Sequence, residues 1–190
     1  MRVIAGSARG RRLAVPPGRA VRPTPDRVRE ALFSRLAARV EGAAVLDLYA
    51  GSGALAVEAL SRGAGHAVLV ERDRRSADVA AANLERAGVA PRARVARIDA
   101  ARFAAEPRGG PFDLVLVDPP YATPLSAVYA RLADLQRAGA LAPDATVVVE
   151  RDKRDPDLDL PPPEFLASEA VRTYGDTVLV YFVTKGSSPR

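Results

Sequence analysis

The residues with the clearest chemical potential are Asp118, Pro119, Pro120 and Tyr121, which follow an apolar run at 114–117. The aspartate carboxylate and the carbonyl of a proline-fixed backbone can both accept hydrogen bonds from a planar amino group. The tyrosine ring can stack on the base that carries this amino group. We therefore expect these four residues to be catalytic and to hold an amino nitrogen for chemical modification.

A second set of candidate residues surrounds a glycine-rich turn, Asp-Leu-Tyr-Ala-Gly-Ser-Gly at 47–53, again at a predicted strand end. Glycine allows a ligand to approach the backbone closely. Glu71 and Asp99 end the next two predicted strands, at the edge where doubly wound sheets bind ligands. There the first can accept hydrogen bonds from ribose hydroxyls and the second from an adenine amino group. The predicted cofactor-binding residues are Asp47, Tyr49, Ala50, Gly51, Ser52, Gly53, Glu71, Arg72, Asp99 and Ala100.

Two cofactors are compatible with such a turn, S-adenosylmethionine and NAD. Residues 51–56 fit the dinucleotide-binding pattern if alanine takes its third glycine position. However, no lysine that could bind phosphate lies near the turn. Asp47, close to the turn, suits a cationic amino-acid tail better than a pyrophosphate. We therefore expect S-adenosylmethionine as the cofactor.

The two motifs together indicate methyl transfer onto nitrogen. An exocyclic amino group of a nucleobase is a poor nucleophile because its lone pair is delocalised into the ring. Hydrogen bonds to Asp118 and to the Pro119 carbonyl would localise this lone pair and aim it at the methyl group, so that positioning supplies much of the catalysis. A base within folded nucleic acid must first be turned out, and Tyr121 offers the surface on which it can stack.

Alternating strands and helices are predicted to position these motifs. Short Val, Leu and Ile runs separated by helices predict a mostly parallel sheet covered on both faces, in an α/β, Rossmann-like fold. Gly175-Asp176 indicates an antiparallel hairpin at the end of the chain. The expected strands are 44–48, 67–71, 94–98, 114–117, 146–149, 167–174 and 177–184. The expected helices lie near 53–62, 75–87, 99–105 and 124–138.

The first forty residues contain ten arginines and only two acidic residues, a net charge of +8 in a chain whose total is +5. Such asymmetry favours contact with a polyanion. A genome that prefers arginine codons explains the many arginines elsewhere, but not the scarcity of acids here. We expect a hairpin of strands at 2–5 and 12–15, and a helix with Thr24 as its N-cap and Pro25 as its first residue. Val28, Leu32 and Leu36 share one face of this helix.

The predicted organisation is a basic extension at 1–40, a catalytic domain at 41–185 and a loose tail at 186–190. The chain contains no cysteine, which excludes disulfides, thiolate metal sites and the cysteine-dependent route to C5-methylated pyrimidines. His66 is the one histidine, and we expect it to be structural or solvated, with no metal site. No apolar run is long enough to span a membrane. We expect a cytoplasmic monomer.

The core of the chain resembles the class I methyltransferases, and Asp-Pro-Pro-Tyr resembles their motif for amino-group modification. The resemblance to the RsmD family is more specific and covers about residues 2–183. It rests on the segments 2–6, 9–13, 22–30 and 47–63. Segment 22–30 distinguishes the RsmD family from other methyltransferases, because Asp-Pro-Pro-Tyr also occurs in adenine-N6 DNA enzymes and in protein-glutamine enzymes. Pro25 and Ala56 depart from the family, which often has threonine and glycine there.

The resemblance implies methylation of N2 of guanine 966 in bacterial 16S ribosomal RNA, within the small ribosomal subunit or its assembly intermediate. It also implies that the first basic block approaches RNA and that 22–29 borders the target pocket. The RNA contacts expected on this basis are Arg2, Arg9, Arg11, Arg12, Arg22, Thr24, Arg27 and Arg29.

Three alternatives stay open at this stage: an adenine-N6 DNA methyltransferase, a non-catalytic RNA-binding protein of ribosome assembly, and an NAD-dependent oxidoreductase. The sequence has no obvious separate target-recognition domain, which favours a structured RNA over DNA. Glu71, Asp99 and Asp118 argue against a pure binding protein, which needs no cofactor pocket. The position of His66 argues against a dehydrogenase, because no proton relay is evident.

Overall fold

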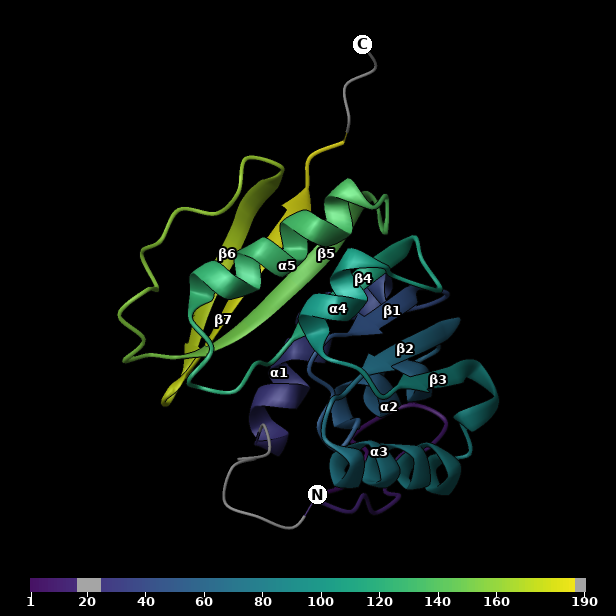
Figure 1. The fold of residues 1–190 in the computed structure, drawn as a ribbon. Coiled ribbons are helices and arrows are strands. Elements are labelled where there is room, and N and C mark those ends of the chain that lie inside the picture. Colours follow the sequence, from purple (N-terminus) through teal and green to yellow (C-terminus); the bar gives the residue numbers. More distant parts are fainter. Residues whose placement is uncertain (17–24, 187–190) are drawn as a thin grey trace.

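A computed structural model describes residues 1–16 and 25–186 of the chain (Figure 1). Its centre is a seven-stranded sheet in the order β3-β2-β1-β4-β5-β7-β6. The strands are β1 (Ala44–Asp47), β2 (His66–Val70), β3 (Ala93–Ala96), β4 (Phe112–Val117), β5 (Leu141–Asp152), β6 (Leu166–Tyr174) and β7 (Thr177–Thr184). Strands β1 to β5 pair in parallel, whereas β7 is antiparallel to both β5 and β6. This confirms the predicted parallel sheet with an antiparallel hairpin at its end.

Helices cover both faces of the sheet (Figure 1). They are α1 (Asp26–Leu36), α2 (Ala54–Ser61), α3 (Arg74–Ala87), α4 (Ala100–Ala105) and α5 (Leu125–Arg137), with short 3-10 turns at Ala37–Arg39 and Ala90–Arg92. Alternate side chains of strand β4 pack against the helices on opposite faces of the sheet. Leu114 and Leu116 pack with α1, α2 and α3, while Val115 and Val117 pack with α4 and α5. Among the described helices, none combines the length and apolarity required to cross a membrane.

Strand β5 is much longer than the predicted 146–149. It begins at Leu141, opposite Phe112, and a register shift against β4 precedes the pairing of Leu114 with Thr146. At its other end β5 continues to Asp152, because β7 pairs with it as far as Thr177. Hydrogen bonding to a neighbouring strand therefore extends β5 beyond its apolar run, which the periodicity alone does not reveal.

The start of the chain also differs from the expectation. The two segments do pair, through an antiparallel bridge between Arg2 and Arg12 and a hydrogen bond from the Leu13 nitrogen to the Met1 carbonyl at 3.0 Å, but they do not form full strands. Helix α1 begins at Asp26 with Pro25 as its N-cap, one residue later than predicted, and Thr24 lies outside the described residues. The predicted apolar face of α1 is confirmed, since Val28, Leu32 and Leu36 are all buried. The division of the chain at residue 40 stays a prediction.

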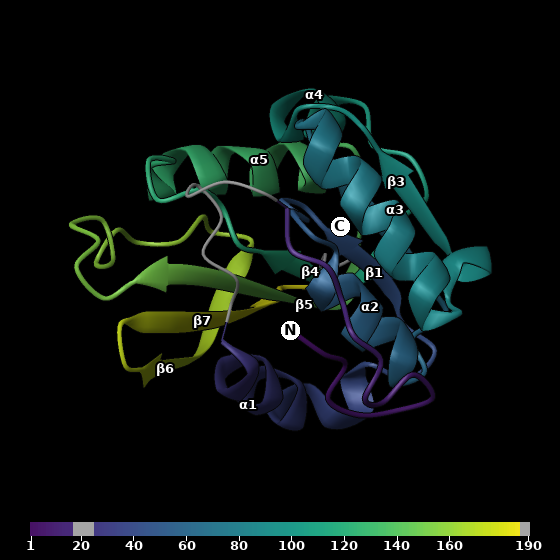
Figure 2. The same cartoon turned by 90° about the horizontal axis from the view of Figure 1, so that it is seen from below.

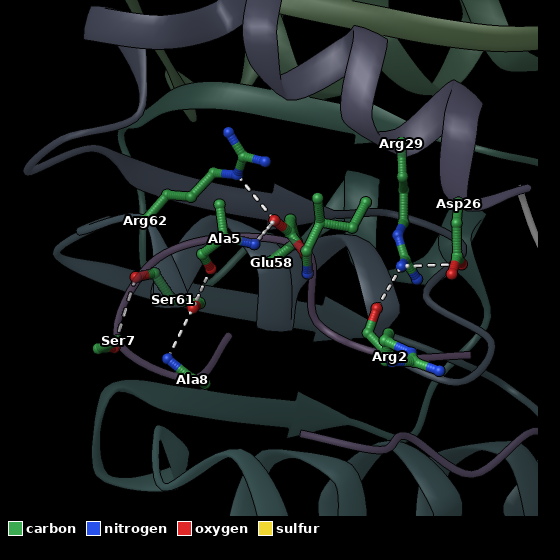
Figure 3. A network of polar contacts seen from close by, with 10 residues as sticks. Arg2, Ala5, Ser7, Ala8, Asp26, Arg29, Glu58, Ser61 and Arg62 are labelled. Atoms are coloured by element: carbon green, nitrogen blue, oxygen red, sulfur yellow. Dashed lines mark hydrogen bonds and ion pairs between the residues drawn. The ribbon is translucent and has the colours of Figure 1, made fainter. Parts of the chain in front are cut away.

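Residues 1–14, called the N-terminal segment below, cross helix α2 (Figure 2) and are fixed to it by Glu58. This carboxylate is 1% exposed. It accepts hydrogen bonds from the backbone nitrogen of Ile4 at 2.8 Å. It also accepts from the backbone nitrogen of Ala5 (3.0 Å) and from Nε of Arg62 (2.8 Å), which Figure 3 labels. A buried carboxylate needs such partners to be tolerated. Helix α2 thus holds the N-terminal segment in one position.

Ser61, at the end of α2, provides the second attachment. Its hydroxyl donates to the Ala5 carbonyl at 2.5 Å and accepts from the Ala8 nitrogen at 2.9 Å (Figure 3). Gly6 adopts a φ of +83°, and a Cβ there would lie 1.8 Å from the Ser61 carbonyl oxygen. Only glycine fits this close approach.

Candidate active site

A cavity of about 350 Å³ opens at the carboxyl ends of the parallel strands. Strands β1 and β4 pair with Asp47 opposite Leu116, so the segments that follow them leave the sheet at the same edge. The cavity therefore brings together the two motifs that lie far apart in the sequence. The predicted site residues that line it are Tyr49, Ala50, Gly51, Ser52, Glu71, Arg72, Asp99, Ala100, Asp118, Pro119, Pro120 and Tyr121.

Glu71 lines the cavity directly after β2 and also shapes the glycine-rich turn. Its Oε2 accepts a hydrogen bond from the Gly51 nitrogen at 2.9 Å, and its Oε1 accepts from the Asp73 nitrogen at 2.7 Å. A carboxylate has about four acceptor positions, so further ones remain for the two hydroxyls of a ribose. Glu71 can thus hold the turn in place and bind a nucleoside at the same time.

Asp99 lines the cavity three residues after β3 and is the N-cap of α4. Its Oδ1 accepts from the Ala101 nitrogen at 2.8 Å, and its Oδ2 lies 3.8 Å from Nη1 of Arg72. The side chain is 51% exposed. Capping orients the carboxylate toward the cavity and leaves acceptor positions for an amino group.

Two residues of the predicted cofactor set do not line the cavity, Asp47 and Gly53. Asp47 is 1% exposed because its side chain turns toward helix α2, where Oδ2 accepts from the Ala56 nitrogen at 3.2 Å. A Cβ on Gly53 would lie 2.9 Å from Cδ2 of Leu69, and its φ is +75°. The structure therefore gives both residues a packing role below the turn in place of the expected direct contact with a ligand.

Asp47 is also electrostatically unusual. The pKa of its carboxyl is raised from 3.8 to about 7, chiefly by burial and to a smaller extent by repulsion from Asp118 and Glu71, against the lowering effect of the Ala56 hydrogen bond. Its Oδ1 has no hydrogen-bond partner among the described residues. In the folded protein the protonated carboxyl is therefore favoured at pH values below about 7.

This pKa predicts how the protein's stability depends on pH. Between about pH 4 and pH 7 the unfolded chain loses the Asp47 proton while the folded protein keeps it, so stability decreases as the pH rises. Asp47→Asn removes the titrating group and keeps an oxygen for the Ala56 N–H. In urea unfolding, the free energy of the variant relative to the native protein should increase from pH 4 to pH 7 and then level off. Equal differences at pH 4 and pH 8 would contradict this prediction.

The Asp118–Tyr121 motif lines the cavity. The Tyr121 side chain is 64% exposed, as a stacking surface for an incoming base requires. A smaller hollow adjoins the cavity here, and four residues line both: Asp118, Pro119, Tyr121 and Glu150.

Among the residues that line the cavity, two charged side chains were not predicted from the sequence, Glu150 of β5 and Arg131 of α5. Glu150 directly follows the apolar run 146–149, which is the same signal that identified Glu71 and Asp118. It could have been found in this way. Arg131 carries no such signal, because it occurs in the middle of an amphipathic helix.

The described arginines predicted to contact RNA fall into two groups. Arg2, Arg9, Arg11, Arg12 and Arg27 are exposed. By contrast, Arg29 is 0% exposed, which corrects its assignment as an RNA contact.

The guanidinium of Arg29 donates to the Arg2 carbonyl at 2.5 Å and pairs with Asp26 at 3.1 Å (Figure 3). Burial lowers the pKa of Arg29, against the raising effect of Asp26 and Glu58. This arginine therefore joins α1 to the N-terminal segment. Arg22 and Thr24 lie outside the described residues.

The sheet order, the antiparallel β7 inserted between β5 and β6, and the cavity at the strand ends define a class I methyltransferase fold. Solved structures of other proteins have the same fold. The yhhF protein of Escherichia coli superposes with a TM-score of 0.85 at 37% identity, covering 98% of this chain and 99% of that one. An RNA methyltransferase from Salinibacter ruber in complex with S-adenosyl-L-homocysteine has the same fold, with a TM-score of 0.64, 19% identity and coverage of 88% and 97%.

The chain belongs to the RsmD family, whose model, described as Conserved hypothetical protein 95, matches residues 1–183. A relative from Escherichia coli (strain K12), named Ribosomal RNA small subunit methyltransferase D, is 44% identical over 154 residues. The alignment covers 80% of this chain and 75% of the relative. The family resemblance stated from the sequence is thereby confirmed.

Proposed function

We propose that this protein transfers a methyl group from S-adenosylmethionine to the exocyclic N2 of a guanine in the 16S RNA of the small ribosomal subunit. The observation that carries the proposal is the single cavity in which Glu71 and the glycine-rich turn face Asp118 and Tyr121. The names of the relatives support ribosomal RNA as the substrate. Guanine N2 follows from the resemblance of segment 22–30 to the RsmD family. We place the reaction in the cytoplasm, where ribosomal subunits assemble.

The residues of the cavity fit S-adenosylmethionine. The cavity volume of about 350 Å³ suits a small-molecule site. Glu71 would hold the ribose hydroxyls, Asp99 the adenine amino group, and the backbone at Gly51 would approach the ligand closely. When bound, the cofactor supplies a methyl group on a positively charged sulfur.

The chain's own residues act on the target amino group. Asp118 and the Pro119 carbonyl accept its two N–H hydrogen bonds, which localises the nitrogen lone pair and points it at the methyl carbon. In that position the lone pair would take up the methyl group that bound S-adenosylmethionine would supply, and the S–C bonding pair would remain with the cofactor as a neutral thioether. The nitrogen then carries a surplus proton, which it releases to Asp118 or water, so no strong base is required.

Tyr121 contributes a stacking surface for the base that has been turned out of its RNA. Tyr121→Ala should reduce kcat/KM by an amount equivalent to roughly 1–3 kcal/mol, as for other contacts between bases and aromatic rings. Tyr121→Phe should retain most activity, because stacking needs the ring and not the hydroxyl. If the phenylalanine variant loses as much activity as the alanine variant, the hydroxyl has a role that this proposal does not include.

The exposed arginines of the N-terminal segment provide phosphate contacts. Because Glu58 and Ser61 fix this segment to α2, its charges are presented in a constant position. Replacing Arg9, Arg11 and Arg12 with alanine should weaken RNA binding and flatten its dependence on salt. Binding of S-adenosylmethionine should be unchanged, since none of the three lines the cavity. Unchanged RNA affinity and salt slope would exclude these contacts.

The direct test of the proposed function uses S-adenosylmethionine with a labelled methyl group. It is incubated with small-subunit particles that lack the modification, with naked 16S RNA and with duplex DNA. Label should enter the ribosomal substrate and not the DNA. Transfer to DNA alone would support the adenine-N6 alternative, and no transfer to any substrate would support a binding protein.

A further inference from the structure

Asn83 of helix α3 connects the N-terminal segment to the glycine-rich turn of the cavity. The residue is 0% exposed. Its amide nitrogen Nδ2 donates to the Ser52 carbonyl and to the Ala14 carbonyl, each at 2.9 Å. Its Oδ1 accepts from the Ala14 backbone nitrogen at 2.8 Å and from Nη1 of Arg86 at 3.4 Å. One buried side chain therefore binds two segments that are far apart in the sequence.

The backbone contacts of Asn83 require an amide side chain. Two of the backbone partners are carbonyl oxygens, which need donors, and the third is an N–H group, which needs an acceptor. Asparagine supplies two N–H donors and one oxygen acceptor from a single planar group. An ionised aspartate has nearly the same shape but no donor for either carbonyl. Because the site is buried, loss of the amide would leave backbone groups without partners.

The Ser52 carbonyl belongs to the turn that is proposed to approach the cofactor. Ser52 lines the cavity and is 8% exposed. The next residue, Gly53, also lies close to α3, since a Cβ there would lie 3.2 Å from the Cβ of Ala80. The turn therefore rests on α3 at two successive residues, and the hydrogen bond from Asn83 fixes the first of them.

The N-terminal segment, which carries the exposed arginines proposed to contact RNA, meets the cavity at two points. Its Leu13 nitrogen donates to the Met1 carbonyl at 3.0 Å, and Met1 lines the cavity directly. Its next residue, Ala14, reaches the glycine-rich turn through Asn83. Arg11 of the same segment donates to a backbone carbonyl near the end of α3 at 2.6 Å. RNA bound to these arginines therefore acts on a segment that is hydrogen-bonded, through one side chain, to the cofactor turn.

We propose that Asn83 is a positioning residue that couples RNA binding on the N-terminal segment to cofactor binding in the cavity. This inference rests on the proposed function and deepens it. RNA that holds the segment also holds Asn83 and the Ser52 carbonyl. The cofactor then meets a turn that is already ordered, so its binding costs less conformational entropy. Coupling between two sites is reciprocal, so bound cofactor strengthens RNA binding by the same factor.

The test uses labelled S-adenosyl-L-homocysteine, which has no methyl group to transfer, so that no reaction occurs during the measurement. Equilibrium dialysis gives its dissociation constant for the native protein alone and with saturating small-subunit particles that lack the modification. The particles should lower this dissociation constant by about 5-fold or more, the usual lower range for coupled sites. Saturating S-adenosyl-L-homocysteine should strengthen particle binding by the same factor. Unchanged affinities in both directions would overturn the inference without the use of any variant.

Asn83→Ala removes the connection, so the ratio of the two dissociation constants should fall toward one. Glu85→Gln is the matched control, because Glu85 is exposed on the same helix and lines neither hollow. It should keep the native ratio. Thermal unfolding establishes that each variant is folded. A purely structural role for Asn83 would weaken binding equally with and without particles, and an unchanged ratio in the folded variant would overturn the inference.

Failure of this inference can be distinguished from failure of the proposed function. Methyl transfer to the particles by a native protein that shows no coupling would overturn the role of Asn83 alone. A native protein that binds neither S-adenosylmethionine nor S-adenosyl-L-homocysteine would overturn both.

Discussion

Asp118→Ala should reduce methyl transfer by at least about 100-fold, the typical cost of removing one preorganised hydrogen-bonding group from a reaction site. The alanine cannot accept a hydrogen bond from the target amino group, so the nitrogen lone pair stays delocalised and is no longer aimed. S-adenosylmethionine affinity should change little, because the proposed partner of Asp118 is the target base. The measurements are single-turnover rates on saturated enzyme and calorimetric titration with the cofactor.

Asp118→Asn is the informative companion variant. Its amide oxygen can still accept one hydrogen bond but carries no charge, so its rate should fall between those of the native protein and Asp118→Ala. A folded Asp118→Ala protein with the native rate would remove this residue from the mechanism. Loss of cofactor binding in the same variant would move its role to the nucleoside site.

Glu71→Ala should weaken S-adenosylmethionine binding by roughly 100-fold or more, since hydrogen bonds to a charged group contribute about 1.5–3 kcal/mol each. Two effects act together. The ribose hydroxyls lose their acceptor, and the Gly51 nitrogen loses the carboxylate that holds the glycine-rich turn, a bond of 2.9 Å. Isothermal titration calorimetry gives the affinity directly.

Glu71→Gln separates these two effects. Its amide oxygen can still accept from the Gly51 nitrogen, while the charge and the second acceptor oxygen are lost. We therefore expect an affinity between those of the native protein and Glu71→Ala. RNA binding should be retained in both variants, because the exposed arginines lie elsewhere. Tight NAD binding with no S-adenosylmethionine binding in the native protein would overturn the cofactor assignment.

Most of the sheet could be predicted from the sequence because its strands are short and apolar on both faces. Val45, Leu46, Val115 and Leu116 form continuous runs, and each run ends at a polar residue or a turn. The carboxyl ends of parallel strands meet at one edge, so the two motifs could be placed together before the structure was known.

What could not be predicted depends on contacts between distant segments. The burial of Arg29 follows from the Arg2 carbonyl that meets its guanidinium, and the composition of the N-terminal segment gives no sign of this contact. Asp47 ends its strand as Glu71 does, but helix α2 covers its side chain. The position of a residue at a strand end and its type identify candidate cofactor-binding residues. Which of these side chains face the cavity is decided by packing.

The central claim is methylation of guanine N2, and the most direct measurement is the identity of the modified nucleoside. Small-subunit particles that lack the modification are incubated with the protein and S-adenosylmethionine, and their RNA is digested to nucleosides for mass spectrometry. We expect N2-methylguanosine at one position, absent when Asp118→Ala replaces the native protein. N6-methyladenosine, or no methylated nucleoside in the presence of a cofactor-binding protein, would contradict the claim.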